Sequence, residues 1–248
     1  MKTYFKIVIM WKLSFLLLLL PFIPNAYGQY TEYSIHINSA LFAFSGNSNA
    51  SSSFVDDYPS PPGNYISNPY GNNFTPSYGI DAQIQRVNRV KMVIGFQFGY
   101  ELLRSHVKID AVISDYDNSI SPAIGGATLK MGFFNLYPYI GHRLTTHSLK
   151  IDLSIGPYLG FNVSNKEKST IKLKTATGSC CTLSLDHKIR NPGTDFGLRP
   201  TMTIYYGHWG ISTSFSYGFH NHRKSSERAY GKHFSRFITL GLVHKATL

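Results

Sequence analysis

Two residues near the C-terminal end of the chain, His233 and Ser235, have types and a spacing that could do chemistry. On a β-strand, residues two apart share a face. A histidine beside a serine can take the hydroxyl proton, provided that a carboxylate orients the imidazole ring. The nearest acid in the sequence, Glu227, falls in a predicted loop, so no such carboxylate is identified. The pair predicts a hydrolase only as an alternative function.

A second set of side chains is charged and falls on the polar faces of alternating segments. A charge enclosed in a narrow barrel must be paired or hydrated, so we expect these side chains to pack against one another as structural elements. A small polar pore and a ligand site are the alternatives. The charges expected inside the barrel are Asp81, Lys91, Glu101, Lys150, Asp152, Asp195 and Arg199.

A basic patch lies near the end of the chain and is expected to contact anionic lipid or lipopolysaccharide phosphate. In the same segment, His220 and His222 could share a strand face and hold a transition metal, but no third ligand is evident. No metal and no cofactor are therefore predicted. The basic side chains of the patch are Arg223, Lys224, Arg228 and Lys232.

The cysteines of the chain are two neighbours, Cys180 and Cys181. This arrangement excludes a disulfide framework. The pair can close a strained ring, bond to another molecule or stay reduced, and the sequence leaves these three states open.

The elements that must position these residues are β-strands, because hydrophobicity alternates with a period of two. The clearest segment is 149–163, in which the odd positions are apolar and the even positions are polar or small. The segment 129–143 breaks strict alternation and is expected to hold a bulge. The eight predicted strands are 33–45, 76–87, 90–102, 129–143, 149–163, 195–206, 211–219 and 232–244.

The links between these strands are alternately long and short. Long polar loops are expected at 46–75, 105–128, 164–193 and 220–231, and the other links are tight turns. Short turns at one end and long loops at the other are typical of membrane barrels, with the turns in the periplasm. The sequence therefore predicts an all-β fold, an eight-stranded antiparallel up-and-down transmembrane barrel. Eight strands leave little space inside the barrel, so a general diffusion pore is not expected.

Aromatic residues near the predicted strand ends could form the girdles found at the two membrane interfaces. These residues are Tyr33, Tyr78, Tyr100, Tyr137, Tyr139, Tyr206 and Trp209.

The N-terminus has the pattern of a cleavable signal peptide, with three early lysines, an apolar run over 13–23 and small residues at Ala26 and Gly28. A retained anchor is the alternative, but the run is shorter than the roughly 20 apolar residues that a span needs. We predict a signal peptide at 1–28 and a barrel domain at 29–248. The chain carries 24 basic and 13 acidic side chains. In an exported barrel this surplus favours lipopolysaccharide over nucleic acid as the counterpart.

Three short motifs resemble the PorT-like outer-membrane β-barrel family over nearly all of the chain after the signal peptide. The resemblance implies an outer-membrane barrel inserted by the barrel-assembly machinery, and it implies no chemistry. The chain ends in Ala246-Thr247-Leu248, where such barrels often carry an aromatic residue that this machinery reads. The motifs are Gly156-Pro157-Tyr158-Leu159-Gly160, Asp195-Phe196-Gly197-Leu198 and Ser216-Tyr217-Gly218-Phe219-His220-Asn221.

The leading hypothesis is a non-enzymatic outer-membrane protein acting in envelope integrity, in surface interaction or as an accessory to protein export. Its expected partners are outer-membrane lipid or lipopolysaccharide and an unknown protein at the external loops. One alternative is an outer-membrane lipid hydrolase using His233 and Ser235, since lipid A deacylases are similar in placing a His and a Ser at this spacing. The other is a soluble periplasmic barrel whose apolar faces enclose a lipophilic ligand.

Overall fold

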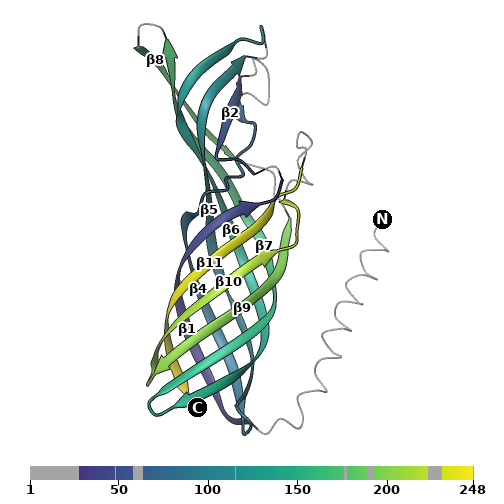
Figure 1. Ribbon diagram of the computed structural model, residues 1–248, viewed down its shortest axis with the longest axis vertical. Helices are drawn as coiled ribbons and strands as arrows, with labels where there is room; N and C mark the ends of the chain where they lie inside the picture. The colour runs from purple at the N-terminus through teal and green to yellow at the C-terminus, as the bar shows by residue number, and fades with distance from the viewer. Residues whose placement is uncertain are drawn as a thin grey trace, which may run out of the picture.

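The computed structural model describes residues 28–47, 49–57, 64–114, 116–175, 178–188, 193–222 and 231–247. These residues form a tilted barrel of strands, and a taller sheet rises from one side of it (Figure 1). The predicted signal peptide, 1–28, lies outside the described residues except for Gly28, and stays a prediction.

A closed ring of eight strands forms the barrel. Every strand of the ring is antiparallel to its two neighbours. β1 closes the ring against β11, from Glu32 opposite Thr247 to Ser45 opposite Phe234. Closure pairs the backbone of every ring strand on both sides, which crossing a lipid bilayer requires. The predicted fold class is confirmed. The ring strands are β1 (Gly28–Ser45), β4 (Thr75–Asn88), β5 (Met92–Ser114), β6 (Ile120–Thr146), β7 (Leu149–Thr175), β9 (Thr194–Tyr206), β10 (Trp209–Gly218) and β11 (Phe234–Thr247).

Tight turns join the ring strands at the lower end of Figure 1. They lie between β4 and β5, between β6 and β7, and between β9 and β10. A positive φ at Lys91 (62°), at His147 (45°) and at Gly207 (59°) lets the backbone reverse within so few residues. The tight turns predicted after 76–87, 129–143 and 195–206 are confirmed, whereas the long links predicted at the opposite end are mostly strand.

Three of the ring strands are much longer than the barrel needs. β5, β6 and β7 have 23, 27 and 27 residues, whereas β9 and β10 have 13 and 10. Their upper parts continue to pair above the ring, together with β2 (Ser52–Asp57), β3 (Tyr65–Ile66) and β8 (Gly178–Lys188). We call this upper sheet the extension. In it, β2 runs parallel to β5, β3 pairs with β2, and β8 pairs with β7 (Figure 1).

The extension corrects the prediction of loops at 105–128 and 164–193 and of a loop without strands at 46–75. Most of the first two ranges continues β5, β6 and β7 or forms β8. Alternation persists there, because Val107, Ile109 and Ile171 are fully buried on one face while β5 and β7 carry mostly charged residues on the other. These segments extend beyond the length that a membrane-spanning strand needs, and their outer face carries many charges. For both reasons their sequence resembles that of polar loops.

The ring has an apolar exterior and a polar interior. Outward side chains such as Ile37, Phe98 and Leu240 are 63%, 52% and 60% exposed. Inward neighbours such as Asn38 and Gln97 are buried. A soluble barrel with a lipophilic ligand inside needs the reverse arrangement, so that alternative is wrong. Within the described residues, no helix is long and apolar enough to cross a membrane.

The predicted aromatic girdles are only partly correct. Tyr33, Tyr78, Tyr206 and Trp209 lie exposed on the outer side. Tyr137 and Tyr139 instead fill the barrel interior, because the odd positions of β6 all face inward.

The irregularity expected in 129–143 lies in the neighbouring strand. β6 keeps strict alternation, but its pairing with β7 shifts where Gly132 and Phe133 face Ser164 and Asn162. The extra residue is therefore Val163 of β7. Below it the even positions of β7 face inward, and above it the odd positions do.

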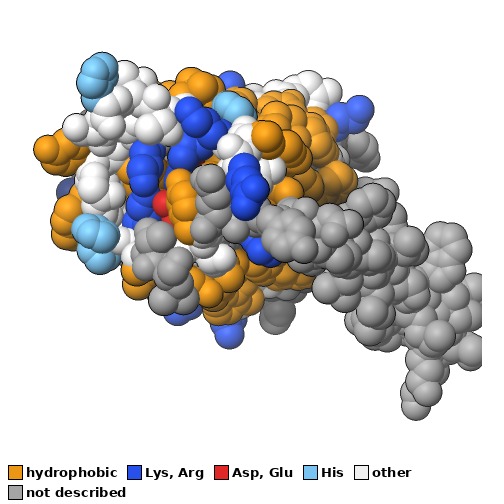
Figure 2. Space-filling model, turned by 90° about the horizontal axis from the view of Figure 1, so that it is seen from below, with side chains coloured by type: hydrophobic (Ala, Val, Ile, Leu, Met, Phe, Trp, Pro, Cys, Tyr) orange, Lys and Arg blue, Asp and Glu red, His pale blue; other side chains and the backbone are white. Residues whose placement is uncertain are grey.

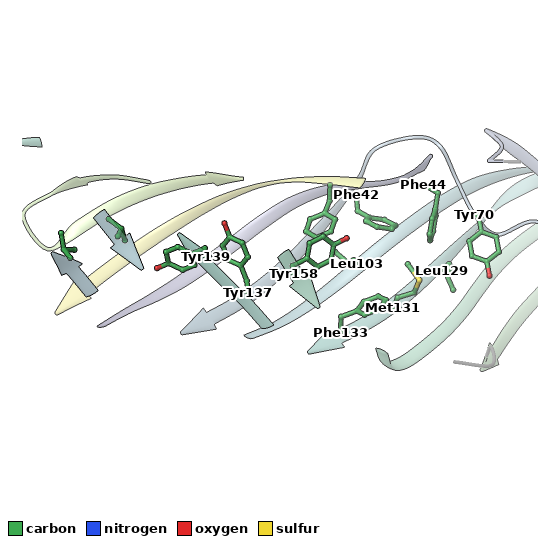
Figure 3. Close-up of a cluster of buried hydrophobic side chains, with 13 residues drawn as sticks. Phe42, Phe44, Tyr70, Leu103, Leu129, Met131, Phe133, Tyr137, Tyr139 and Tyr158 are labelled. Carbon is green, nitrogen blue, oxygen red and sulfur yellow. The ribbon is translucent and has the colours of Figure 1, made fainter. Parts of the chain in front are cut away.

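Two separate clusters of buried apolar side chains result. The first runs along the barrel interior, with Phe42, Phe44 and Phe133 toward its upper end and Tyr137 and Tyr139 toward the lower end (Figure 3). The second lies within the extension, where Val55 of β2 and Ile66 of β3 meet Ile171 of β7 and Leu185 of β8. The extension thus has a hydrophobic core of its own.

Candidate functional site

The lower part of the barrel interior holds a network of buried charges centred on Arg143 of β6. Its guanidinium binds both carboxylate oxygens of Glu32, at 2.9 and 2.6 Å, and both of Asp152, at 2.5 Å each. Lys245 Nζ lies 2.9 Å from Glu32 Oε1. Gln85 donates to Glu32 Oε2 at 2.6 Å. We call these five residues the lower ion network.

The lower ion network balances two cations against two carboxylates. Each charge is 4% exposed or less, so the mutual pairing is what makes burial tolerable. Seen from below, Lys and Arg side chains gather near the centre of the molecule while hydrophobic side chains lie toward its margin (Figure 2). The network fills the barrel near its lower end.

A second group of charges lies in the middle of the barrel. Arg199 Nη2 is 3.2 Å from Glu101 Oε1, and the guanidinium carbon lies 5.1 Å from the ring centres of Tyr158 and Phe237. Asp81 accepts hydrogen bonds from Asn38 and, at 2.9 Å, from Gln97. The void beside these residues measures about 10 Å³. That is about the smallest space that holds one water, so the interior is packed at this level.

The sequence-predicted pair His233 and Ser235 lies inside the barrel near its upper end. Both side chains are buried, at 0% and 1% exposure. Ser235 Oγ donates to Asp195 Oδ2 at 2.5 Å, and the Tyr158 hydroxyl donates to the same oxygen at 3.0 Å. On the other side of the carboxylate, His222 Nε2 lies 3.5 Å from Asp195 Oδ1.

This upper cluster supplies the carboxylate that the sequence did not identify, but in a different order from a hydrolase. In a catalytic triad the imidazole stands between hydroxyl and carboxylate, because it must carry the proton. Here Asp195 stands between the Ser235 hydroxyl and the His222 ring. The arrangement holds β11, β9 and the segment before β11 together, and it faces the barrel interior rather than lipid.

Most of the other charges expected inside are found there. Lys150 lies half-buried near the lower end, with its ammonium 5.6 Å from the Tyr30 ring centre. Lys91 is a correction, because it occupies the turn between β4 and β5 with a left-handed backbone and an exposed side chain. The buried charges from the predicted set are Asp81, Glu101, Asp152, Asp195 and Arg199.

Sequence reasoning missed Glu32, Arg143 and Lys245, which make up most of the lower ion network. Glu32 stands one residue before the predicted first strand, and Lys245 one residue after the predicted last one. Extending the period-two pattern by one position at each end would have found both. Arg143 is the last residue of the predicted strand 129–143 and lies on its inward side, so the same pattern would have found it.

The remaining predicted residues lie near the upper loops. Lys232 is exposed, whereas Arg223, Lys224 and Arg228 lie outside the described residues, so the predicted lipid contacts stay a prediction. His220 and His222 do come together, with ring centres 5.4 Å apart. In the part of the chain that the structure describes, no group of three or more His, Cys, Asp or Glu could hold a metal ion.

The predicted cysteine pair is only half described. Cys181 is an exposed residue of β8, and the side chain of Cys180 lies outside the described residues.

The described interior of the extension contains one buried acid, Glu167 of β7, which is 4% exposed and lies opposite His187 of β8 in the strand register. Its Oε1 has no hydrogen-bond partner among the described residues. Burial raises the pKa of Glu167 to about 7, while a backbone hydrogen bond from Ile66 acts in the opposite direction. The stability of the packing of β3 against β7 should therefore depend on whether Glu167 is protonated.

A closed ring with lipid-facing apolar side chains and a charged, packed interior defines an outer-membrane β-barrel. No family model and no curated protein matches the chain, so the PorT-like resemblance stays a prediction.

Solved outer-membrane barrels are similar to the chain at low identity. The attachment invasion locus protein Ail of Yersinia pestis, solved with the heparin analogue sucrose octasulfate, is 10% identical, with 87% of this chain and 99% of Ail covered and a TM-score of 0.37. Neisserial surface protein A is 10% identical (86% and 96% covered, TM-score 0.34). The protease OmpT of Escherichia coli is 9% identical (90% and 98% covered, TM-score 0.36). Likenesses at these scores carry no argument about function.

Proposed function

We propose that this chain is a non-enzymatic outer-membrane protein that holds the extension outside the cell as a surface for contact with other molecules. The observation that carries the proposal is the second hydrophobic core, in which residues of β2, β3, β7 and β8 pack together above the barrel. Anchoring in lipid needs only the ring. A sheet above the ring with a hydrophobic core of its own is explained by a role outside the membrane.

The packed interior supports a contact role over a transport role. The lower ion network fills the barrel near one end, and the aromatic rings of Phe42, Phe44 and Phe133 fill it near the other. A continuous polar path for solutes would have to displace both. Envelope integrity and assistance to protein export are the neighbouring roles in the same class, and the PorT-like resemblance favours the second of them.

The test is a variant without the extension, in which 51–69, 104–130 and 164–192 are each replaced by a tight Asn-Gly turn. The ring keeps its pairing in this variant, so we expect the folded protein to retain an anomalous gel mobility until it is boiled. We expect cells carrying it to lose adhesion to host-type matrices and to one another. The matched control is the unaltered protein at the same surface level.

Unchanged adhesion would contradict the contact role. If the variant instead makes cells sensitive to detergent, the protein acts in envelope integrity. If it lowers the amount of secreted protein, it acts in export.

A lipid hydrolase is the second candidate, and the specific observation in its favour is that a serine, an aspartate and a histidine, Ser235, Asp195 and His222, lie together inside the barrel. The test is release of acyl chains from lipid A by the purified protein in detergent. A hydrolase would release them and would stop doing so in the Ser235→Ala variant. Equal lipid A in deletion and wild-type cells would exclude this function.

A further inference from the structure

Four basic residues lie in one row across the outer face of the extension. Arg104 of β5 is directly opposite Lys130 of β6, and Lys130 is opposite Lys166 of β7. Lys166 in turn is opposite Lys188 of β8. The row therefore crosses four neighbouring strands at one height, and we call these four residues the basic row. Lys166 and Lys188 are exposed, and the other two are half-buried.

The basic row stands at the upper border of the apolar exterior. On β5 the outward position before Arg104 is Leu102, and below it come Tyr100 and Phe98. On β7 the last apolar outward residue is Val163, with a 52% exposed side chain. The outer face thus changes from apolar to cationic within one or two outward positions, about 7 to 14 Å along a strand. This is the height at which lipid headgroups meet the barrel.

Charge of one sign at directly opposed positions destabilises a sheet. In the described residues no salt bridge neutralises any member of the row. Asp186 of β8, on the same face, is bound to Lys168 at 2.8 Å and also interacts electrostatically with Lys166. Arg104 is positioned instead by Tyr78, whose hydroxyl accepts a hydrogen bond from Nη2 at 3.2 Å. Four cations near one carboxylate that is already paired leave a net positive charge at the headgroup level, which calls for an anionic ligand.

We propose that the basic row binds the phosphate groups of lipid A in the outer leaflet around the barrel. Four strands about 4.8 Å apart spread the row over roughly 14 Å. That width suits a phosphorylated disaccharide headgroup better than a single phosphate ion. The apolar surface below receives the acyl chains, which a free phosphate lacks. The inference rests on the proposed orientation, in which the extension lies outside the cell, and it adds a lipid partner to that surface.

The experiment measures binding of the refolded full barrel in nanodiscs to lipopolysaccharide, to enzymatically dephosphorylated lipopolysaccharide and to inorganic pyrophosphate. The test variant is K130Q/K166Q/K188Q. The matched control is K108Q/K172Q/K174Q, which removes the same charge from the same outer face farther from the membrane. Boiled and unboiled gel mobility shows that each variant is folded. A third variant, K130R/K166R/K188R, keeps the charge.

We expect the test variant to bind lipopolysaccharide on the order of a hundredfold more weakly, from about fivefold per lysine near an anionic surface. The control variant should change affinity by less than about fivefold, and the arginine variant should bind like the wild type. Dephosphorylated lipopolysaccharide should bind wild type as weakly as intact lipopolysaccharide binds the test variant.

Equal losses in test and control variants would overturn the proposal, because general charge would then explain binding. So would tight, row-dependent binding of pyrophosphate without any effect on lipopolysaccharide. Loss of lipid A binding in the test variant would support the row as the lipid A site. If adhesion were also unchanged on removal of the extension, the contact role would be refuted. Normal lipid A binding in the test variant would refute the proposal for the basic row. If adhesion were lost on removal of the extension, the contact role would still stand.

Discussion

The lower and upper parts of β5 and β7 have opposite sidedness. In the barrel these strands face outward with residues such as Phe98 and Ile155 and inward with Glu101 and Asp152. In the extension β5 and β7 face outward with residues such as Lys108 and Lys172 and inward with residues such as Val107 and Ile171, whereas β6 carries Ile124 outward. The inversion occurs at the basic row, without a break in the pairing of β5 with β6.

The inversion shows that surroundings, and not strand geometry, decide which face is apolar. In lipid the outward face must be apolar, and an interior too narrow for a channel is filled by paired charges. In water the burial of apolar side chains drives folding, so the inner face becomes a hydrophobic core. The two regions therefore depend on different interactions, and substitutions should separate them.

The largest effect is expected from Arg143→Ala in the lower ion network. The substitution leaves Glu32 and Asp152 buried beside each other without their guanidinium. We expect the free energy of unfolding of the barrel to fall by about 4 kcal/mol. The measurement is the urea concentration at which the heat-modifiable band disappears.

The matched control removes the whole charge set at once, in the variant R143M/E32Q/D152N/K245M. Because replacing a complete buried network is often nearly neutral, this variant should regain most of the lost stability. Equal instability of the two variants would mean that shape, rather than uncompensated charge, sets the cost.

The next effect is expected in the extension. Ile171 is fully buried in its core, so Ile171→Ala should destabilise the extension by about 3 kcal/mol. The barrel should keep its heat-modifiable mobility, because its ring pairing is intact. Limited proteolysis of whole cells measures the effect as faster cleavage within residues 104–188. Simultaneous loss of the barrel band would show that the two regions fold as one unit.

Two substitutions to lysine test whether the outer faces of the barrel and of the extension have different surroundings. Ile155 in the barrel and Ile124 in the extension are outward residues of 45% and 56% exposure. Ile155→Lys should cost about 2 to 3 kcal/mol, because its charge enters lipid. Ile124→Lys should be nearly neutral, because its charge enters water. Urea unfolding in lipid vesicles compares the two, and similar costs would mean that both positions share one environment.

The smallest effect concerns pH and Glu167. Its pKa is raised by burial from 4.5 to about 7, so the folded extension holds a proton that the unfolded chain releases. The extension is then most stable below pH 4.5 and loses stability as the pH rises through 7. Between pH 5 and pH 8 we expect a loss of roughly 2 kcal/mol.

Hydrogen exchange of the β7 and β8 amides at both pH values measures this loss. Glu167→Gln should remove most of the difference, whereas amides of β9 and β10 should show none. A pH dependence that is the same in the variant would assign it to another group.

The barrel could be predicted from the sequence because its signals are local. Period-two alternation marks each strand. The short turns after 76–87, 129–143 and 195–206 make the strands on either side of each turn antiparallel neighbours. The interior position of Asp152, Asp195 and Arg199 follows from the same alternation. These features need no knowledge of residues far away in the chain.

The extension and the networks could not be predicted in the same way. A strand that passes from lipid into water keeps its period but exchanges its faces, so 105–128 and 164–193 resemble charged loops. The contact of Ser235 with Asp195 depends on the register among β9, β10 and β11, which pairing over long sequence separation sets. The row from Arg104 to Lys188 depends on three such registers.

The most direct test of the inversion is cysteine labelling of intact cells with a membrane-impermeant maleimide, in a C180S/C181S background. Cysteine is placed at outward positions above the basic row, Lys108 and Thr128, and below it, Phe98 and Phe134. We predict rapid labelling at the first two positions and none at the other two. Labelling of Phe98→Cys or Phe134→Cys as fast as Lys108→Cys, or labelling of the upper positions only after lysis, would contradict the account.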